Sequence, residues 1–361
     1  MIRLAKFRYA LLALFTLSVA LQSPVDAGVI TFGTGSNQFD MTFVEIGNPG
    51  NDAWRQAAAG FLDDDGHGQK NIDISVRVSI EGERAHLDFT ESADQTLGPV
   101  NAVRAITASA STYVFRCLAP PDLPTNAGCE RPITIETRPG SVVDATYPAA
   151  VAVGNVETSQ VVTDCLFAAT GRLAPSQGTM NNFTFGNENH QYYETIAGGS
   201  GAGPDHDGTS AVQTHMTNSR LTDPEILETR LPVRLDYFAI RRGSGGAGKH
   251  SGGDGVERRI TFLEAMRANM LANRRDVPPR GIEGGSDALP GRNWVERGDG
   301  TREDLTATDS AQMHSGDAFV ILTPGGGGYG NPANRSPAAL AQDVAEGYVT
   351  LKAVKTVYRD N

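Results

Sequence analysis

Apolar and polar residues alternate over short runs along much of the chain, which predicts many short β-strands. The clearest runs are ISVRVSI (74–80) and AHLDF (85–89), joined at Glu81-Gly82, and later RLDYFAI (234–240) and ERRITFLE (257–264). Successive side chains of a strand point to opposite faces, so each run can bury one side against a core. The pattern therefore indicates sheets with one buried face.

Three segments instead carry apolar residues at helical spacing. They cover residues 99–118, 156–173 and 336–346. Asn155 precedes the second segment as a candidate N-cap, and Ser336 begins the third in the same role. Together with the strands, they predict an α+β fold that is rich in short strands and glycine-rich turns, with about three helices packed on the sheets.

Residues 1–27 are typical of a secretory signal peptide. Three cations stand at its start (Arg3, Lys6, Arg8), and the apolar run at 10–21 is too short to span a bilayer. Small residues near Ala27 offer a cleavage site. The leader predicts export to the periplasm or beyond the cell.

Residues 28–52 have a separate character. GVITFGTGSNQFDMTFVEIGNPGN alternates strongly and predicts a strand that ends in an Asn-Pro-Gly turn. This stretch resembles the mature start of exported formylglycine-generating-enzyme-like proteins, without any catalytic residue. We therefore expect three parts, at 1–27, 28–52 and 53–361.

Composition narrows the class of protein. The 361 residues are 39% hydrophobic and 20% charged, which is typical of a globular chain with an ample core. The net charge of −11 argues against nucleic-acid binding. The three cysteines (Cys117, Cys129, Cys165) predict either buried thiols or, in an oxidising compartment, a bridge between the first two.

The stretch from 175 to 220 is dominated by small, amide and hydroxyl side chains. With so few apolar residues it cannot serve mainly to fill a core. Strand-like patches interrupt its turns, so we expect a structured polar pocket or a subunit surface. The candidate substrate-binding residues of this stretch are Asn181, Asn182, Gln213, Asn218 and Arg220.

Two residues of the same stretch are candidate catalytic groups. Glu194 follows two tyrosines, and a carboxylate held in an apolar strand is expected to have a raised pKa, as a general base requires. The alternative for Glu194 is an ion pair with Arg220 or Arg230. His215 is a candidate proton carrier or, alternatively, a structural histidine.

Acidic groups elsewhere allow simpler explanations. The run Asp63–Asp65 lacks the spacing of a calcium loop, so we expect a solvated turn. Asp205, His206 and Asp207 could bind a metal ion, although a solvated loop also explains them. Glu157 lies at a helix start, where N-terminal capping accounts for a carboxylate. No metal site is predicted.

Two glycine-rich runs invite a nucleotide-binding interpretation. Residues 243–249 fit the spacing of a phosphate-binding loop until His250 replaces the Ser or Thr that would hold Mg²⁺. A strand rather than a helix follows, so we predict a connection between strands. TPGGGGYG (323–330) predicts a flexible strand exit.

Several long motifs then carry a family resemblance. They are NVETSQ (155–160), SQGTMNN (176–182), YYETIAGGSGAG (192–203), QTHMTNSRLTDPEILE (213–228), RRGSGGAGKHSGGDG (241–255) and TPGGGGYG (323–330). In this order they resemble the hydantoinase B/5-oxoprolinase family, from about Trp54 to the C-terminus. The chain resembles the C-terminal half of an N-methylhydantoinase B-like subunit.

The resemblance implies an ATP-dependent hydrolase that opens a hydantoin or 5-oxoproline ring. It implies a hydantoinase A-like partner subunit that binds ATP with Mg, and a cytoplasmic location, whereas the leader predicts export. The family's His-His metal motif is absent from this sequence. The alternative is a catalytically inactive, truncated or chimeric member that keeps the fold and a subunit-docking surface.

Overall fold

The computed structural model describes residues 27–32, 39–44, 53–121, 123–217 and 219–358. The chain divides into two compact units. The smaller holds the chain to Arg55, with Ser79–His86 and Arg116–Thr134, and the larger holds Gln56–Val78, Leu87–Phe115 and Ile135–Asn361. The predicted leader and the Asn-Pro-Gly turn lie outside the described residues. The domain boundaries expected from the sequence stay a prediction.

The N-terminal strands form two sheets. A hairpin pairs β1 (Ala27–Phe32) with β2 (Phe39–Val44) in antiparallel register. A four-stranded sheet then has the order β3–β4–β5–β6, with strands β3 (Ala53–Asp64), β4 (Lys70–Glu81), β5 (Arg84–Asp88) and β6 (Ile133–Glu136). β4 and β5 confirm the two alternating runs, and Gly82 between them adopts a positive φ of 56°.

Two helices follow, α2 (Arg104–Leu118) and α3 (Ser159–Ala169). Both lie where helical spacing predicts them, although α2 begins later than expected. A π-helical turn, Gly154–Thr158, leads into α3, so Asn155 lies inside this turn and does not cap the helix. α3 packs on β3 and β4: a Cβ at Gly60 would meet Cys165 Sγ at 2.8 Å, and that sulfur is 3.6 Å from the Ile74 carbonyl.

The C-terminal half of the larger unit contains a β-sandwich. One sheet has the order β14–β11–β7–β8 and the other β13–β12–β15–β10–β9. The first sheet comprises β7 (Asn182–Gly186), β8 (Gln191–Thr195), β11 (Met266–Leu271) and β14 (Thr308–Met313). The second comprises β9 (Val233–Ile240), β10 (Val256–Phe262), β12 (Arg292–Glu296), β13 (Arg302–Leu305) and β15 (Ala318–Leu322). β9 and β10 confirm the strands expected at 234–240 and 257–264.

Alternating apolar residues of both sheets fill the sandwich core. The ring of Phe183 on β7 lies 4.7 Å from that of Phe319 on β15, and Phe185 lies 5.2 Å from Phe262 on β10. These aromatic contacts join the two inner faces. The short helix α4 (Pro224–Arg230) begins at its N-cap Asp223 and contributes Leu227 to the same core.

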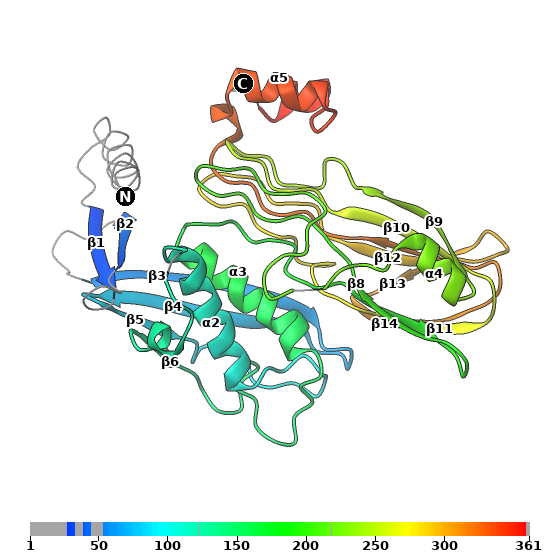
Figure 1. The fold of residues 1–361 in the computed structure, drawn as a ribbon, viewed down its shortest axis with the longest axis horizontal. Coiled ribbons are helices and arrows are strands. Elements are labelled where there is room, and N and C mark those ends of the chain that lie inside the picture. Colours follow the sequence, from blue (N-terminus) through cyan, green and yellow to red (C-terminus); the bar gives the residue numbers. More distant parts are fainter. Residues whose placement is uncertain (1–26, 33–38, 45–52, 122, 218, 359–361) are drawn as a thin grey trace. The chain divides into compact units, whose positions relative to one another are not determined.

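Glycine-rich segments form a packed layer beside the sandwich, and Figure 1 draws them as extended traces that run side by side. Their backbone N–H groups bond to one another's carbonyls, as in Gly246 to Gly326 at 2.9 Å and Gly326 to Gly253 at 2.9 Å. A Cβ at Gly326 would lie 2.0 Å from the Ser200 carbonyl oxygen. The segments are therefore in backbone contact, which only glycine permits. The flexible exit expected at 323–330 is wrong, because residues 323–328 are buried and hydrogen-bonded.

The chain ends in two short helices, α5 (Pro337–Ala345) and α6 (Leu351–Thr356). Ser336 caps α5 by accepting a hydrogen bond from the Ala339 N–H at 3.2 Å, as expected. The predicted α+β, strand-rich fold is confirmed, with five α-helices rather than three among the described residues. No helix in this part of the chain has the length and apolar character needed to cross a membrane.

Candidate functional site

An open cavity of about 550 Å³, with a mixed polar and apolar lining, lies in the larger unit next to His215. Tyr113 contributes to it from α2, and most of the remaining lining comes from the polar stretch singled out in the sequence. That stretch contributes hydroxyl, amide, imidazole and apolar side chains, which belong to Ser200, Thr209, Val212, Gln213, Thr214, His215, Met216 and Thr217. Of the residues expected to bind substrate or act in catalysis, His215 and Gln213 lie on this cavity.

His215 is held between two hydroxyl groups. Tyr113 Oη lies 2.9 Å from Nδ1, and Ser176 Oγ lies 3.1 Å from Nε2. The ring of Phe167 packs 5.0 Å away. Burial lowers the pKa of His215 to about 4, because the charged imidazolium would lose its hydration. The imidazole is therefore neutral at physiological pH, and a group that holds a proton so weakly is suited to orienting hydroxyls rather than to general-base catalysis.

Gln160 holds residues 214–217, which form one wall of the cavity. It is fully buried on α3, and its Nε2 donates to the His215 carbonyl oxygen and to Thr217 Oγ1 at 3.0 Å. Its Oε1 accepts a hydrogen bond from Thr214 Oγ1 at 3.3 Å. One side-chain amide thus holds three residues of the lining. The motif NVETSQ contains Gln160 without giving it a role; its signal was an amide in the first turn of a helix, directly before the apolar pair Val161-Val162.

The segment 211–217 also contains strained backbone. Ala211 and Met216 adopt positive φ values of 53° and 60°, a region that side chains with a Cβ rarely occupy. Such conformations cost about 1–3 kcal/mol each and persist only where the surroundings enforce them. The hydrogen bonds of Gln160 supply that enforcement at residues 214–217.

Asn181 and Asn182 lie behind the cavity and not on its lining. Asn181 Nδ2 donates to Gln177 Oε1 at 2.8 Å and to the Ile196 carbonyl at 3.1 Å. Asn182 Nδ2 donates to Glu157 Oε1 at 2.7 Å. Both side chains are buried and hydrogen-bonded inside the protein. They do not contact substrate as expected, but support the segments around the cavity.

Glu157 is a buried acid that bonds to the segment at 180–182, rather than the helix cap expected from the sequence. Its carboxyl group is fully buried, and Oε1 accepts hydrogen bonds from the Met180 N–H at 3.1 Å and from Asn182. Oε2 has no hydrogen-bond partner among the described residues. Burial raises the pKa of Glu157 to about 8, so the group is protonated at neutral pH. The helix that follows Glu157 is buried on almost all sides, whereas a carboxylate that only caps a helix is usually exposed.

Glu194 lies in the sandwich core and forms an ion pair. Arg258 Nε and Nη2 donate to its two carboxylate oxygens at 2.8 and 2.9 Å, with both side chains about 1% exposed. Burial raises the pKa of Glu194, as expected. The expected partners, Arg220 or Arg230, are wrong, because Arg258 on the adjacent sheet points into the core. A carboxylate that is occupied in this way does not serve the cavity.

Of the remaining substrate-binding candidates, Arg220 is exposed and is not part of the cavity lining. Asn218 lies outside the described residues. Near the N-terminus, Asp63 and Asp65 are buried rather than part of a solvated turn: Asp65 Oδ1 accepts the N–H groups of His67 at 2.8 Å and of Gln69 at 3.0 Å. These carboxylates stabilise backbone and not a bound ion.

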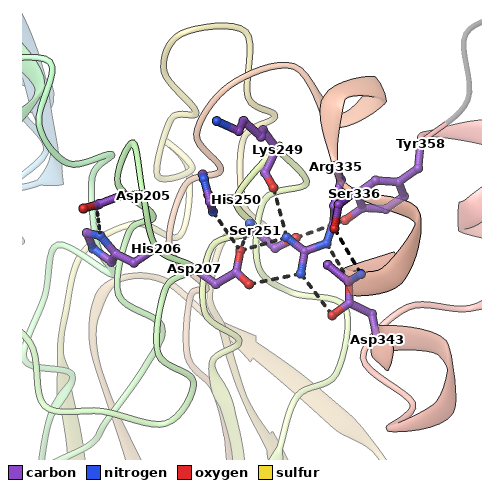
Figure 2. A network of polar contacts seen from close by, with 11 residues as sticks. Asp205, His206, Asp207, Lys249, His250, Ser251, Arg335, Ser336, Asp343 and Tyr358 are labelled. Carbon is purple, nitrogen blue, oxygen red and sulfur yellow. Dashed lines mark hydrogen bonds and ion pairs between the residues drawn. The ribbon is translucent and has the colours of Figure 1, made fainter. Parts of the chain in front are cut away.

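Asp205, His206 and Asp207 do not form one cluster. Asp205 pairs with His206 at 2.9 Å, whereas Figure 2 shows Asp207 turned toward the guanidinium of Arg335. Arg335 makes bidentate contacts to Asp207 at 2.8 and 3.0 Å and to Asp343 of α5 at 2.6 and 3.0 Å. Across the described ranges, no group of three or more His, Cys, Asp or Glu side chains could hold a metal ion.

The family model described as "Hydantoinase B/oxoprolinase" matches residues 45–332. The chain is 44% identical to a 5-oxoprolinase of Dictyostelium discoideum over 74% of its own length and 21% of that protein. It is 45% identical to 5-oxoprolinase 1 of Arabidopsis thaliana over 72% of its length and 20% of that protein. The chain therefore spans about a fifth of these curated relatives.

A solved structure is similar as well. It is the ATP-dependent caprolactamase of Pseudomonas jessenii, with a TM-score of 0.73 and 25% identity. The superposition covers 84% of this chain and 56% of that one. The likeness covers most of this chain, so its fold is shared with an enzyme of that name.

Proposed function

Because the chain belongs to the hydantoinase B/oxoprolinase family, we propose that it forms part of an ATP-dependent enzyme that opens a cyclic amide. The substrate is a hydantoin or 5-oxoproline ring, and a hydantoinase A-like subunit binds ATP with Mg. The observation that carries the proposal is the cavity at His215, whose lining is uncharged and rich in hydrogen-bonding groups. Such a lining suits a small planar ring with an amide edge.

The proposed reaction divides the work between the two proteins. An amide carbonyl is a poor electrophile, and transfer of the γ-phosphoryl group of ATP to its oxygen makes the carbon open to attack by water. The ring C–N bond then breaks, and hydrolysis of the resulting acyl phosphate releases phosphate. The Tyr113 hydroxyl, oriented by neutral His215, can hydrogen-bond to the ring in the cavity.

We place ATP on the partner because backbone N–H groups of the glycine-rich run at 243–249 are already hydrogen-bonded within the protein. The Gly246 N–H donates to the Gly326 carbonyl, and the Gly245 N–H donates to Asp254 Oδ1 at 2.7 Å. Neither N–H is therefore free to donate to a phosphate oxygen. His250 stands where a Mg²⁺-binding hydroxyl would be required. The described residues offer no ligand set for a divalent metal either. We therefore derive no step through a metal on this chain.

The test is turnover by the reconstituted pair. The full chain is combined with the ATP-binding subunit, and ADP release is measured with and without hydantoin or 5-oxoproline. We expect ADP release that depends on the cyclic amide, and a fall of about tenfold in kcat/KM for Tyr113→Phe, which loses one hydrogen bond.

Tyr237→Phe is the matched control, because Tyr237 is an exposed residue of β9. Its kcat/KM should equal that of the native chain. Absence of turnover with every partner and ring would contradict the proposal. It would favour the alternative of an inactive family member that keeps only the fold and a docking surface.

A further inference from the structure

The hydroxyl of Thr214, on the cavity wall, has its proton committed inside the protein. The Gln160 amide is oriented by the His215 carbonyl, which can only accept, so Nε2 faces His215 and Oε1 faces Thr214. Thr214 must then donate to Gln160. Its oxygen is also approached by Gln177 Nε2 at 3.5 Å, in an orientation that Asn181 enforces. Thr214 therefore has no proton left for a ligand.

Thr217 and Gln213 on the same wall show the same direction of bonding. Thr217 Oγ1 accepts from Gln160 and donates to the His215 carbonyl at 3.4 Å. Gln213 Nε2 donates to the Thr195 carbonyl at 3.1 Å, and a carbonyl partner excludes the flipped amide. Gln213 Oε1 is buried from solvent and has no hydrogen-bond partner among the described residues. The protons of these side chains are therefore committed inside the protein, and the only positions left on them for a ligand are acceptors.

The lining described for the cavity also lacks charge. It contains no Lys, Arg, Asp or Glu, and burial keeps His215 neutral. The one arginine proposed from the sequence to hold a ligand, Arg220, is exposed and outside the lining. A carboxylate has only acceptor oxygens and needs donors or a cation in exchange for its hydration. The net charge of −11 adds to this unfavourable field.

From these contacts we infer that the wall Gln213–Thr217 accepts the N–H edge of an uncharged ring amide and excludes a ligand carboxylate. The inference rests on the proposed function, since it concerns the same cavity. A hydantoin, with two N–H groups and no carboxylate, fits the wall better than 5-oxoproline does. Where a ring carries a carboxylate, that group must point away from this wall.

Three small ligands test the inference on the native full chain, without ATP or a partner. 2-Pyrrolidinone is neutral and has an N–H, N-methyl-2-pyrrolidinone lacks the N–H, and 5-oxoproline adds a carboxylate to the first. Binding is followed by NMR shifts of the Tyr113 and His215 ring signals. We expect 2-pyrrolidinone to bind at least tenfold more tightly than either of the others. Equal or tighter binding of 5-oxoproline, or no binding of 2-pyrrolidinone, would overturn the inference.

Gln213→Lys provides the complementary test, because it adds a cation to the wall. We expect the preference to shift at least tenfold toward 5-oxoproline. Gln342→Lys is the matched control, an identical substitution on the exposed face of α5, and should leave the ligand preference unchanged. An equal shift in both variants would show that net charge, and not the wall, sets the preference.

The two proposals can fail separately. If no partner gives turnover but the chain still prefers 2-pyrrolidinone, the proposed enzymatic function is rejected and the inferred ligand preference stands. Turnover of 5-oxoproline by the pair, together with its tight binding to this chain alone, would keep the enzyme and reject the ligand class.

Discussion

Glu157 and His215 are buried titratable groups of opposite type, and both are neutral at physiological pH. Desolvation acts against the charged form of each, which raises the pKa of the carboxyl group to about 8 and lowers that of the imidazole to about 4. Around the cavity, ligand recognition therefore depends on the direction of hydrogen bonds rather than on charge. At the residue scale, the site depends on which atoms donate and which accept.

Substitution Glu157→Gln should remove a pH dependence of stability. The folded-state pKa of about 8 lies above the ordinary 4.5, so the native state holds an extra proton between these values. The free energy of unfolding of the native chain should then fall as pH rises from about 4.5 to 8. The glutamine oxygen can accept the same two hydrogen bonds without ionising. Relative to the native chain, the variant should gain up to about 4 kcal/mol between pH 5 and pH 9, at about 1.4 kcal/mol per unit.

Urea unfolding across that pH range measures the effect. Glu225→Gln, at an exposed position of α4, is the control and should show no such gain. Parallel pH curves for Glu157→Gln and the native chain would show that the Glu157 carboxyl group is ionised in the folded protein.

At the scale of elements, the glycine-rich segments act as structural parts in their own right. Ordinary loops lie on the surface and are mobile, whereas residues 323–328 are buried and hydrogen-bonded to several other segments of the chain. Because one backbone lies directly on another, the absence of Cβ atoms is the condition for packing. The layer also holds Ser200, which contributes to the cavity lining.

Gly326→Ala should therefore destabilise the larger unit. A Cβ there would meet the Ser200 carbonyl oxygen at 2.0 Å and its carbon at 2.2 Å, and neither backbone atom can move without its neighbours. We expect a loss of about 3 kcal/mol in the free energy of unfolding. The control is Gly298→Ala, where the nearest atom is 3.9 Å from the new Cβ and φ is not positive. Thermal unfolding of the two variants should differ clearly; similar melting temperatures would contradict close backbone packing.

At the scale of the whole molecule, one buried cation joins the C-terminal helix α5 to the rest of the larger unit. α5 and α6 contain no buried residue, yet the side chain of Arg335 is only 4% exposed and holds Asp343 of α5 to Asp207. Bidentate guanidinium–carboxylate pairs of this kind fix geometry as well as supplying energy. The end of the chain is therefore attached mainly through this ion-pair cluster, together with a hydrogen bond from Arg242 to the Glu346 carbonyl at 3.1 Å and the buried side chain of Tyr358.

Arg335→Met should release that segment without unfolding the sandwich. Removing the cation leaves two carboxylates facing each other, at a cost of about 2 kcal/mol or more. Amide hydrogen exchange of residues 337–358 should accelerate about 30-fold, while residues of β10 and β15 keep their protection. Arg302→Met, at an exposed pair on β13, should change neither. Uniform acceleration over both regions would instead assign Arg335 to the stability of the whole unit.

The sequence by itself determined the strand runs at 74–80 and 234–240, the Ser336 cap and the α+β class, because these follow from local periodicity and capping chemistry. It also singled out the 175–220 stretch, since so polar a segment cannot fill a core. The long motifs are enough to indicate the family. Each of these features is encoded within a few consecutive residues.

Only the tertiary structure decided which polar residues meet. Asn182 and Gln213 belong to one stretch of similar composition, yet the fold buries the first beneath Glu157 and sets the second on the cavity. Arg258 replaced Arg220 as the partner of Glu194 because β10 and β8 belong to different sheets that share one core. Such pairings join residues tens of positions apart, and their outcome depends on desolvation, which no local pattern records.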